Sequence, residues 1–157
     1  MILVAYYSRS GKTKLAAEDI ARRLNADTER IMDKTDRSGL MGFLHAGRDA
    51  MRDIPTQIEK SEKDPSVYDT VVIGMPVWAG NITPPIKAYL VRHKDSFKQI
   101  AFFTTAFFEK PEKFIDKLEN IIGKKFVCFT GFAGKEFKPK LKDAYEHKLS
   151  VFVSKIQ

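Results

Sequence analysis

The chain opens with the sequence MILVAYYSRSGKTKLAAEDIARRL (residues 1–24), which decides the class of fold. Residues 2–7 are a continuous apolar run, which is typical of a strand buried on both faces of a sheet. Residues 12–24 follow with helical periodicity, in which Ala16 and Ile20 share one apolar face. A strand, a polar loop and a helix are therefore predicted, and this is the first unit of an α/β fold.

The same alternation continues through the rest of the chain. Further strands are predicted at residues 28–32, 69–75, 99–105 and 125–130, and helices at 40–52, 84–92, 111–122 and 142–156. Thr83 is expected to cap the helix at 84–92, with Pro84 in its first turn. Strands joined by helices favour one domain over residues 1–157, a three-layer α/β fold with a doubly wound, five-stranded parallel sheet. Such sheets bind ligands at the carboxyl ends of their strands.

The composition is that of a globular protein that needs no disulfide bond or structural metal. The 157 residues are 43% hydrophobic and 30% charged, and a chain of this length buries a sizeable core. Cys128 is the only cysteine and lies in an apolar run, so it is expected to be an unreactive core residue. A lone thiol fits a reducing cytoplasm. No apolar run approaches the roughly 18 residues of a membrane span, and the N-terminus lacks the basic region of a signal peptide.

The net charge of +7 is unevenly distributed along the chain. Residues 92–157 carry 14 Lys and Arg against 8 Asp and Glu, whereas residues 1–91 carry 13 against 12. A basic half could face nucleic acid or an acidic protein. Because the lysines are dispersed and interleaved with acids, a solvated basic face is favoured. No nucleic-acid or membrane partner is expected, and an acidic redox partner protein is one of the partners that this charge allows.

The loop after the first strand combines hydroxyls, a glycine and two cations: Ser8, Arg9, Ser10, Gly11, Lys12 and Thr13. The N–H groups and the dipole of a helix N-terminus attract anions, and the glycine lets the backbone approach closely. A phosphate site is predicted, with an ordinary capped turn as the alternative. The phosphate loop of nucleotide triphosphatases needs a glycine where this chain has Tyr6, and the loop is too short to wrap two phosphates, so that class is disfavoured.

The loop after the third strand holds the only tryptophan among small residues: Pro76, Val77, Trp78, Ala79 and Gly80. An aromatic side chain in a loop at the ligand-bearing edge can stack on a flat ring, and the backbone can hydrogen-bond the edge of that ring. The alternative is a tryptophan that only closes the core. Together the two loops predict a phosphorylated flat heterocycle as the ligand.

These motifs resemble those of the flavodoxin superfamily over nearly the whole chain. YYSRSGKT (6–13) resembles the Ser/Thr-x-Thr-Gly-x-Thr phosphate loop of flavodoxins, with Ser10 replacing the second threonine. YDTVVIGMPVWAGNITPPIKAYL (68–90) looks like the flavin-side loop, and DKTDRSGLMGFLHAGRDAM (33–51) is similar to a small, mostly bacterial flavodoxin-like branch. The resemblance implies strand order 2-1-3-4-5 and noncovalent FMN.

The resemblance also implies the roles of the candidate residues. The phosphate would be held by the loop at residues 8–13, and the isoalloxazine would be lined by residues 76–80. The third loop, from Thr105 and Ala106 through Phe107, would complete the pocket. It departs from the small residues common in this branch, because Phe107 and Phe108 are bulky. They could cover the second face of the ring or narrow the pocket.

The resemblance favours electron transfer, as a carrier or as a small FMN-dependent reductase of quinone or NAD(P)H type. The alternative is a flavodoxin-fold interaction or regulatory module that has lost flavin. His45, His93 and His147 are widely separated, so no catalytic acid or base and no metal site is predicted. The oligomeric state is not predicted.

Overall fold

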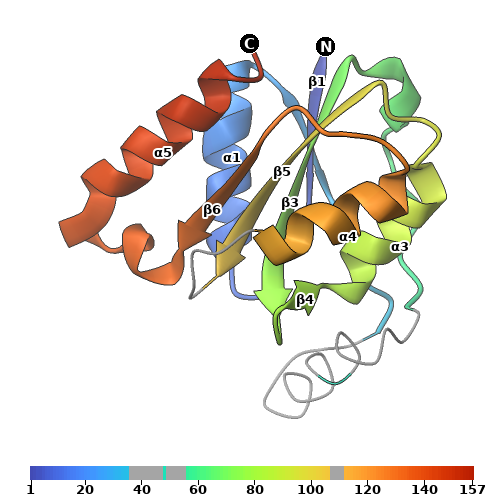
Figure 1. The fold of residues 1–157 in the computed structure, drawn as a ribbon, viewed down its shortest axis with the longest axis horizontal. Coiled ribbons are helices and arrows are strands. Elements are labelled where there is room, and N and C mark those ends of the chain that lie inside the picture. Colours follow the sequence, from blue (N-terminus) through green and yellow to red (C-terminus); the bar gives the residue numbers. More distant parts are fainter. Residues whose placement is uncertain (36–47, 49–55, 107–111) are drawn as a thin grey trace.

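The computed structural model describes residues 1–35, 48, 56–106 and 112–157 (Figure 1). Its strands are β1 (Ile2–Tyr6), β2 (Asp27–Arg30), β3 (Thr70–Trp78), β4 (Asn81–Ile82), β5 (Gln99–Ala106) and β6 (Phe129–Ala133). Its helices are α1 (Lys12–Leu24), α3 (Pro84–His93), α4 (Glu112–Ile122) and α5 (Lys142–Ser154), with short 3-10 turns η1 (Pro65–Val67), η2 (Gly134–Phe137) and η3 (Pro139–Leu141). The helix predicted at 40–52 lies outside the described residues.

The sheet has the predicted topology. Its parallel strands lie in the order β2-β1-β3-β5-β6, which is the order 2-1-3-4-5 when only the long strands are counted. The short β4 pairs antiparallel with the end of β3. Figure 1 shows α1 and α5 on one side of the sheet and α3 and α4 on the other. The three-layer, doubly wound architecture is therefore confirmed.

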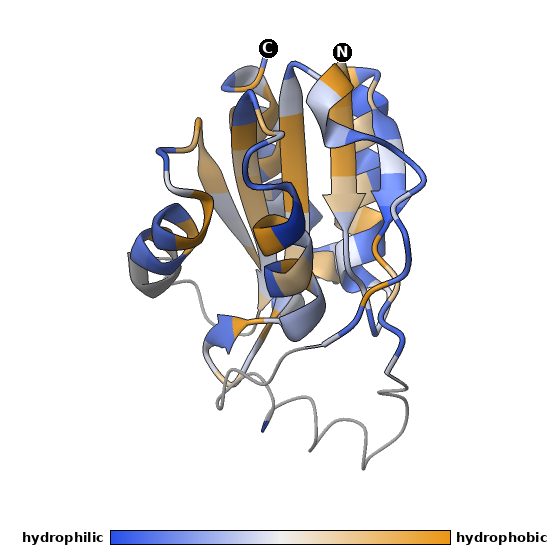
Figure 2. Cartoon of the chain, turned by 90° about the vertical axis from the view of Figure 1, so that its right-hand side faces the viewer, coloured by the Kyte–Doolittle hydropathy of each residue, from blue (hydrophilic) through white to orange (hydrophobic). Residues whose placement is uncertain are grey.

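Alternate residues of each strand supply two separate cores. Leu3 and Ala5 of β1 face the layer that contains α3, whereas Val4 and Tyr6 face α1 and α5. Figure 2 shows the resulting apolar strands between the helices. Both faces are buried because helices cover both, which explains why β1 is continuously apolar rather than alternating. Cys128 is buried as expected, and burial raises the pKa of its thiol to about 11.

Two local predictions need correction. The last strand runs over Phe129–Ala133 rather than 125–130, since its register is set by pairing with β5 and not by its apolar run. Thr83 occupies the N-cap position of α3, but within the described part of the chain its buried hydroxyl has no hydrogen-bond partner. A capping hydroxyl accepts from the N–H of the second or third helical residue; Pro85, at the second position, has no N–H, and the hydroxyl makes no hydrogen bond to the N–H of Ile86 at the third. Among the described residues, no helix is long and apolar enough to cross a membrane.

Candidate functional site at the carboxyl ends of the strands

The N-terminus of α1 forms the first wall of the site. Gly11 is its N-cap residue at φ 91°, a left-handed conformation that glycine adopts without strain. Among the described residues, no side chain caps this helix end, and its first turn contains no acid. Ser8 is 4% exposed, and its hydroxyl accepts a hydrogen bond from the Gly11 N–H at 3.2 Å. The exposed Arg9 and Ser10 lie between them. The positive end of the helix dipole therefore faces a loop of hydroxyls, which suits an anion.

A buried hydrogen bond joins this loop to the third candidate loop. The hydroxyls of Thr13, in the first turn of α1, and Thr105, near the end of β5, lie 2.7 Å apart. Thr13 is 2% and Thr105 is 8% exposed, so little of the contact is open to solvent. Ala106, the last residue of β5, is partly buried beside it. Two predicted site residues that are 92 positions apart in the sequence are thus brought into direct contact.

The second candidate loop is a tight hairpin, and the predicted position of Trp78 in a loop is wrong. Strand β3 continues through Trp78, which pairs with Asn81 of β4. Only Ala79 and Gly80 form the turn, with φ of 47° and 74°. Positive φ at both central residues defines a type I′ turn, whose twist matches that of the paired strands. Strand pairing therefore carries β3 beyond its apolar run, and Pro76 and Val77 also lie within the strand.

Trp78 connects the hairpin to the first loop. It is only 8% exposed, and its ring meets Tyr7 edge-on with the centroids 5.5 Å apart. The guanidinium carbon of Arg9 lies 5.7 Å from the centroid of the Trp78 ring, a cation–π contact. Trp78 belongs to the core on the α3 side and also borders the candidate site. The first loop therefore contacts both the hairpin and the end of β5, where the third candidate loop begins.

Three further residues support the site and escaped the sequence prediction. The guanidinium of Arg30, at the end of β2, donates to the carbonyl oxygen of Ser8 at 3.4 Å. Asn81 donates to the carbonyl oxygen of Ala79 at 3.1 Å and accepts a hydrogen bond from Lys117 of α4. The contacts of Arg30 and Lys117 have no local sequence signal, because each depends on which elements become neighbours, whereas the contact of Asn81 with Ala79 lies within the turn itself. Lys12 is partly buried at the start of α1. Phe107 and Phe108 lie outside the described residues.

Comparison with known proteins identifies the family. The flavodoxin family model matches residues 1–127, and the chain therefore belongs to the flavodoxin family. No curated protein matches the chain significantly.

Solved structures share its fold. A Lactobacillus acidophilus flavoprotein in complex with FMN is 23% identical, with a TM-score of 0.72 over 95% of this chain and 97% of that chain. Oxidised flavodoxin 2 from Bacillus cereus is 17% identical, with a TM-score of 0.54 over 98% and 95% of the two chains. Two-electron reduced flavodoxin from Megasphaera elsdenii is 12% identical, with a TM-score of 0.55 over 96% and 99%.

Proposed function

We propose that this protein binds FMN at the carboxyl edge of its sheet and uses it to transfer electrons. The observation that carries the proposal is the N-terminus of α1, which has no side-chain cap among the described residues and no acid in its first turn. Membership of the flavodoxin family and the FMN held by the Lactobacillus acidophilus flavoprotein of the same fold support it.

The hydroxyl groups of the first loop suit a phosphate. When Thr13 and Thr105 share one hydrogen bond, one hydroxyl donates and the other keeps its own hydrogen. Ser8 accepts from the Gly11 N–H and likewise keeps a hydrogen to donate. In the proposed assignment these hydroxyls, Ser10 and the first N–H groups of α1 hold the phosphate, and the cations Arg9 and Lys12 add attraction.

The hairpin at residues 76–80 suits the flat ring of the same ligand. Its turn presents backbone groups at the edge of the sheet, and Lys117 holds it through Asn81. Thr105 and Ala106 end the neighbouring strand. Phe107 completes the proposed assignment. Bound FMN would supply the redox chemistry, and the chain would bind and orient it and set its electrostatic surroundings.

Calorimetric titration with FMN and with riboflavin tests the phosphate assignment. A charge-assisted hydrogen bond contributes about 1.5–3 kcal/mol, so two of them predict a preference for FMN of at least about a hundredfold. Ser10→Ala should weaken FMN and leave riboflavin unchanged, whereas Ser96→Ala, at a half-buried position beyond α3, is the matched control. Equal affinities for the two flavins would contradict the phosphate site. Failure to bind either flavin would favour the alternative of an interaction module without flavin.

The carrier and reductase forms of the proposal differ in what reduces the protein. Anaerobic mixing of the FMN-loaded protein with NADH or NADPH should bleach the flavin absorbance if it is a reductase of NAD(P)H type. Bleaching only by a reduced protein donor or by dithionite would identify a carrier. Adding a soluble quinone to the reduced protein then tests the quinone-reductase form.

A further inference from the structure

A groove lies beside the proposed flavin site, between the first turn of α1 and the segment that leads into α5. It has a volume of about 390 Å³, and its apolar walls are Leu15, Phe137 and Pro139. Leu15 is 56% exposed although it is a large apolar side chain. These side chains give the groove an apolar floor that an apolar side chain of a partner could bury.

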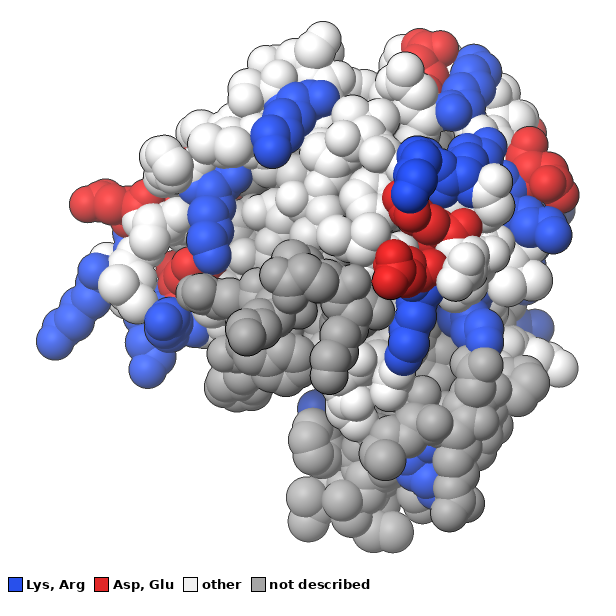
Figure 3. Space-filling model, viewed as in Figure 1, with Lys and Arg blue, Asp and Glu red and all other residues white. Residues whose placement is uncertain are grey.

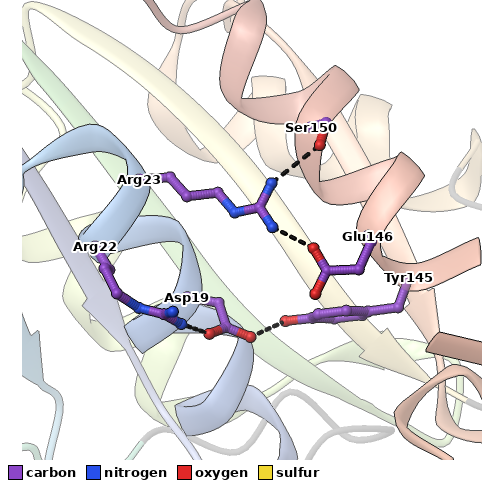
Figure 4. A network of polar contacts seen from close by, with 6 residues as sticks. All are labelled: Asp19, Arg22, Arg23, Tyr145, Glu146 and Ser150. Atoms are coloured by element: carbon purple, nitrogen blue, oxygen red, sulfur yellow. Dashed lines mark hydrogen bonds and ion pairs between the residues drawn. The ribbon is translucent and has the colours of Figure 1, made fainter. Parts of the chain in front are cut away.

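The carboxylates that line this groove are all engaged within the molecule. Asp19 pairs with Arg22 and also accepts a hydrogen bond from the hydroxyl of Tyr145 at 2.9 Å, and Glu146 pairs with Arg23 (Figure 4). Glu136, which is only 5% exposed, pairs with a lysine of α5 at 2.8 Å. The negative charges of the groove are therefore neutralised internally.

The rim of the groove is positive. Lys138 and Lys142 line the groove, and Lys140 lies between them in the chain. All three are exposed, and none of the ion pairs among the described residues involves them. Figure 3 shows basic side chains projecting from this side of the molecule, around η2, η3 and the start of α5, with acidic side chains in the same region; Asp143 lies in the first turn of α5. Leu141, 37% exposed, lies among these lysines. An apolar centre with a charged rim has the anatomy of a protein interface.

The groove begins one helical turn from the proposed phosphate site. The N–H of Leu15 donates to the carbonyl oxygen of Gly11 at 3.0 Å, the first hydrogen bond of α1. A protein seated on Leu15 would therefore lie beside the phosphate end of the proposed FMN site, at the same edge of the sheet as the hairpin proposed to hold the ring.

We propose that this groove docks an acidic surface of a redox partner protein, an inference that rests on the proposed electron-transfer function. The partner's carboxylates would face Lys138, Lys140 and Lys142, and an apolar side chain would enter between Leu15 and Phe137. A second copy of this chain is disfavoured because its net charge of +7 would repel the same face. Nucleic acid would match the lysines and would leave the apolar walls uncovered.

An acidic plant-type [2Fe–2S] ferredoxin is the probe. Calorimetry on the two oxidised proteins measures docking without electron transfer, with and without FMN. Raising NaCl from about 0.01 to 0.15 M shortens the screening length from about 30 to about 8 Å, so binding should weaken steeply. In stopped flow, the reduced cluster should lose one electron to the FMN-loaded protein, with the same dependence on salt.

The variant K138E/K140E/K142E should weaken ferredoxin binding at least about tenfold, because rim charges set the rate of encounter. The matched control is K60E/K94E/K155E, which makes the same change in net charge at exposed positions outside the groove; it should weaken binding less than about threefold. Unfolding midpoints show that both variants fold. Chemical-shift changes of the amides on ferredoxin addition should cluster at Leu15 and residues 137–142.

Three results would overturn the docking proposal: equal weakening by the two triple variants, shift changes on another face, or tighter binding of an oligothymidylate than of ferredoxin to the lysine rim. Each leaves the FMN titration untouched, so a failed docking surface is distinguished from a failed flavin site. Ferredoxin binding that persists in the groove when no flavin binds would support the surface while contradicting the proposed cofactor.

Discussion

The hydroxyls of Thr13 and Thr105 form a contact whose energy can be isolated by replacing each threonine with valine, which has the same shape. Neither residue is more than 8% exposed, so water has little access to replace a lost partner in the flavin-free protein. Each single substitution leaves the other hydroxyl buried and unpaired, which costs about 1–3 kcal/mol. The double variant removes both hydroxyls together and should lie within about 1 kcal/mol of wild type. The two single losses together should therefore exceed the loss in the double variant by at least about 1 kcal/mol, and this excess is the coupling energy.

Urea unfolding of the flavin-free protein, followed by circular dichroism, measures the four free energies of this cycle. The denaturant slopes should stay equal, since the substitutions change no surface exposed on unfolding. Additive losses in the double variant would show that the two hydroxyls are independent, and the reasoning that joins the first and third loops would fail. The double variant should also bind FMN more weakly, because it keeps neither hydroxyl hydrogen for a phosphate.

Three further perturbations test the hairpin, the buried carboxyl and the tryptophan. Ala79→Asn should stabilise the protein by about 1 kcal/mol and raise its melting midpoint by about 2–4 °C, because asparagine tolerates positive φ and suits this turn; an unchanged midpoint would contradict the turn. Burial raises the pKa of the Glu29 carboxyl above its ordinary value of 4.5. The protonated carboxyl therefore contributes its full share to the free energy of unfolding below the unfolded pKa, and this contribution is lost as the pH rises through the folded pKa. Glu29→Gln keeps an oxygen that accepts from the N–H of Glu62, and it cannot titrate. The free energy of unfolding of this variant should therefore fall less with rising pH than that of wild type; parallel curves for the two proteins would contradict the role of Glu29. Emission from Trp78 should be quenched by FMN, and unchanged emission at saturation would mean that its ring faces away from the flavin.

Several features of this protein could be predicted from local sequence alone. The unbroken apolar run at residues 2–7 predicted a strand covered on both faces, and the structure confirms it. The alternation of strands with helices predicted a parallel sheet, since parallel neighbours need crossovers. Hydroxyls and Gly11 between a strand and a helix predicted an anion site, and the structure gives that helix end no side-chain cap among the described residues. These features depend on residues that lie within a few positions of one another, so they can be predicted from the spacing of apolar and polar residues in the sequence.

Tertiary structure decided the features that join distant segments. The register of β6 follows its hydrogen bonds to β5 and not its own apolar run, and pairing with β4 carries β3 through Trp78. The contact between Thr13 and Thr105 exists because β1 and β5 end at the same edge of the sheet. The groove beside α1 likewise needs α5 to return against it. Such contacts are fixed by which surfaces pack together to bury apolar area, and that choice is made by the whole chain rather than by any short segment.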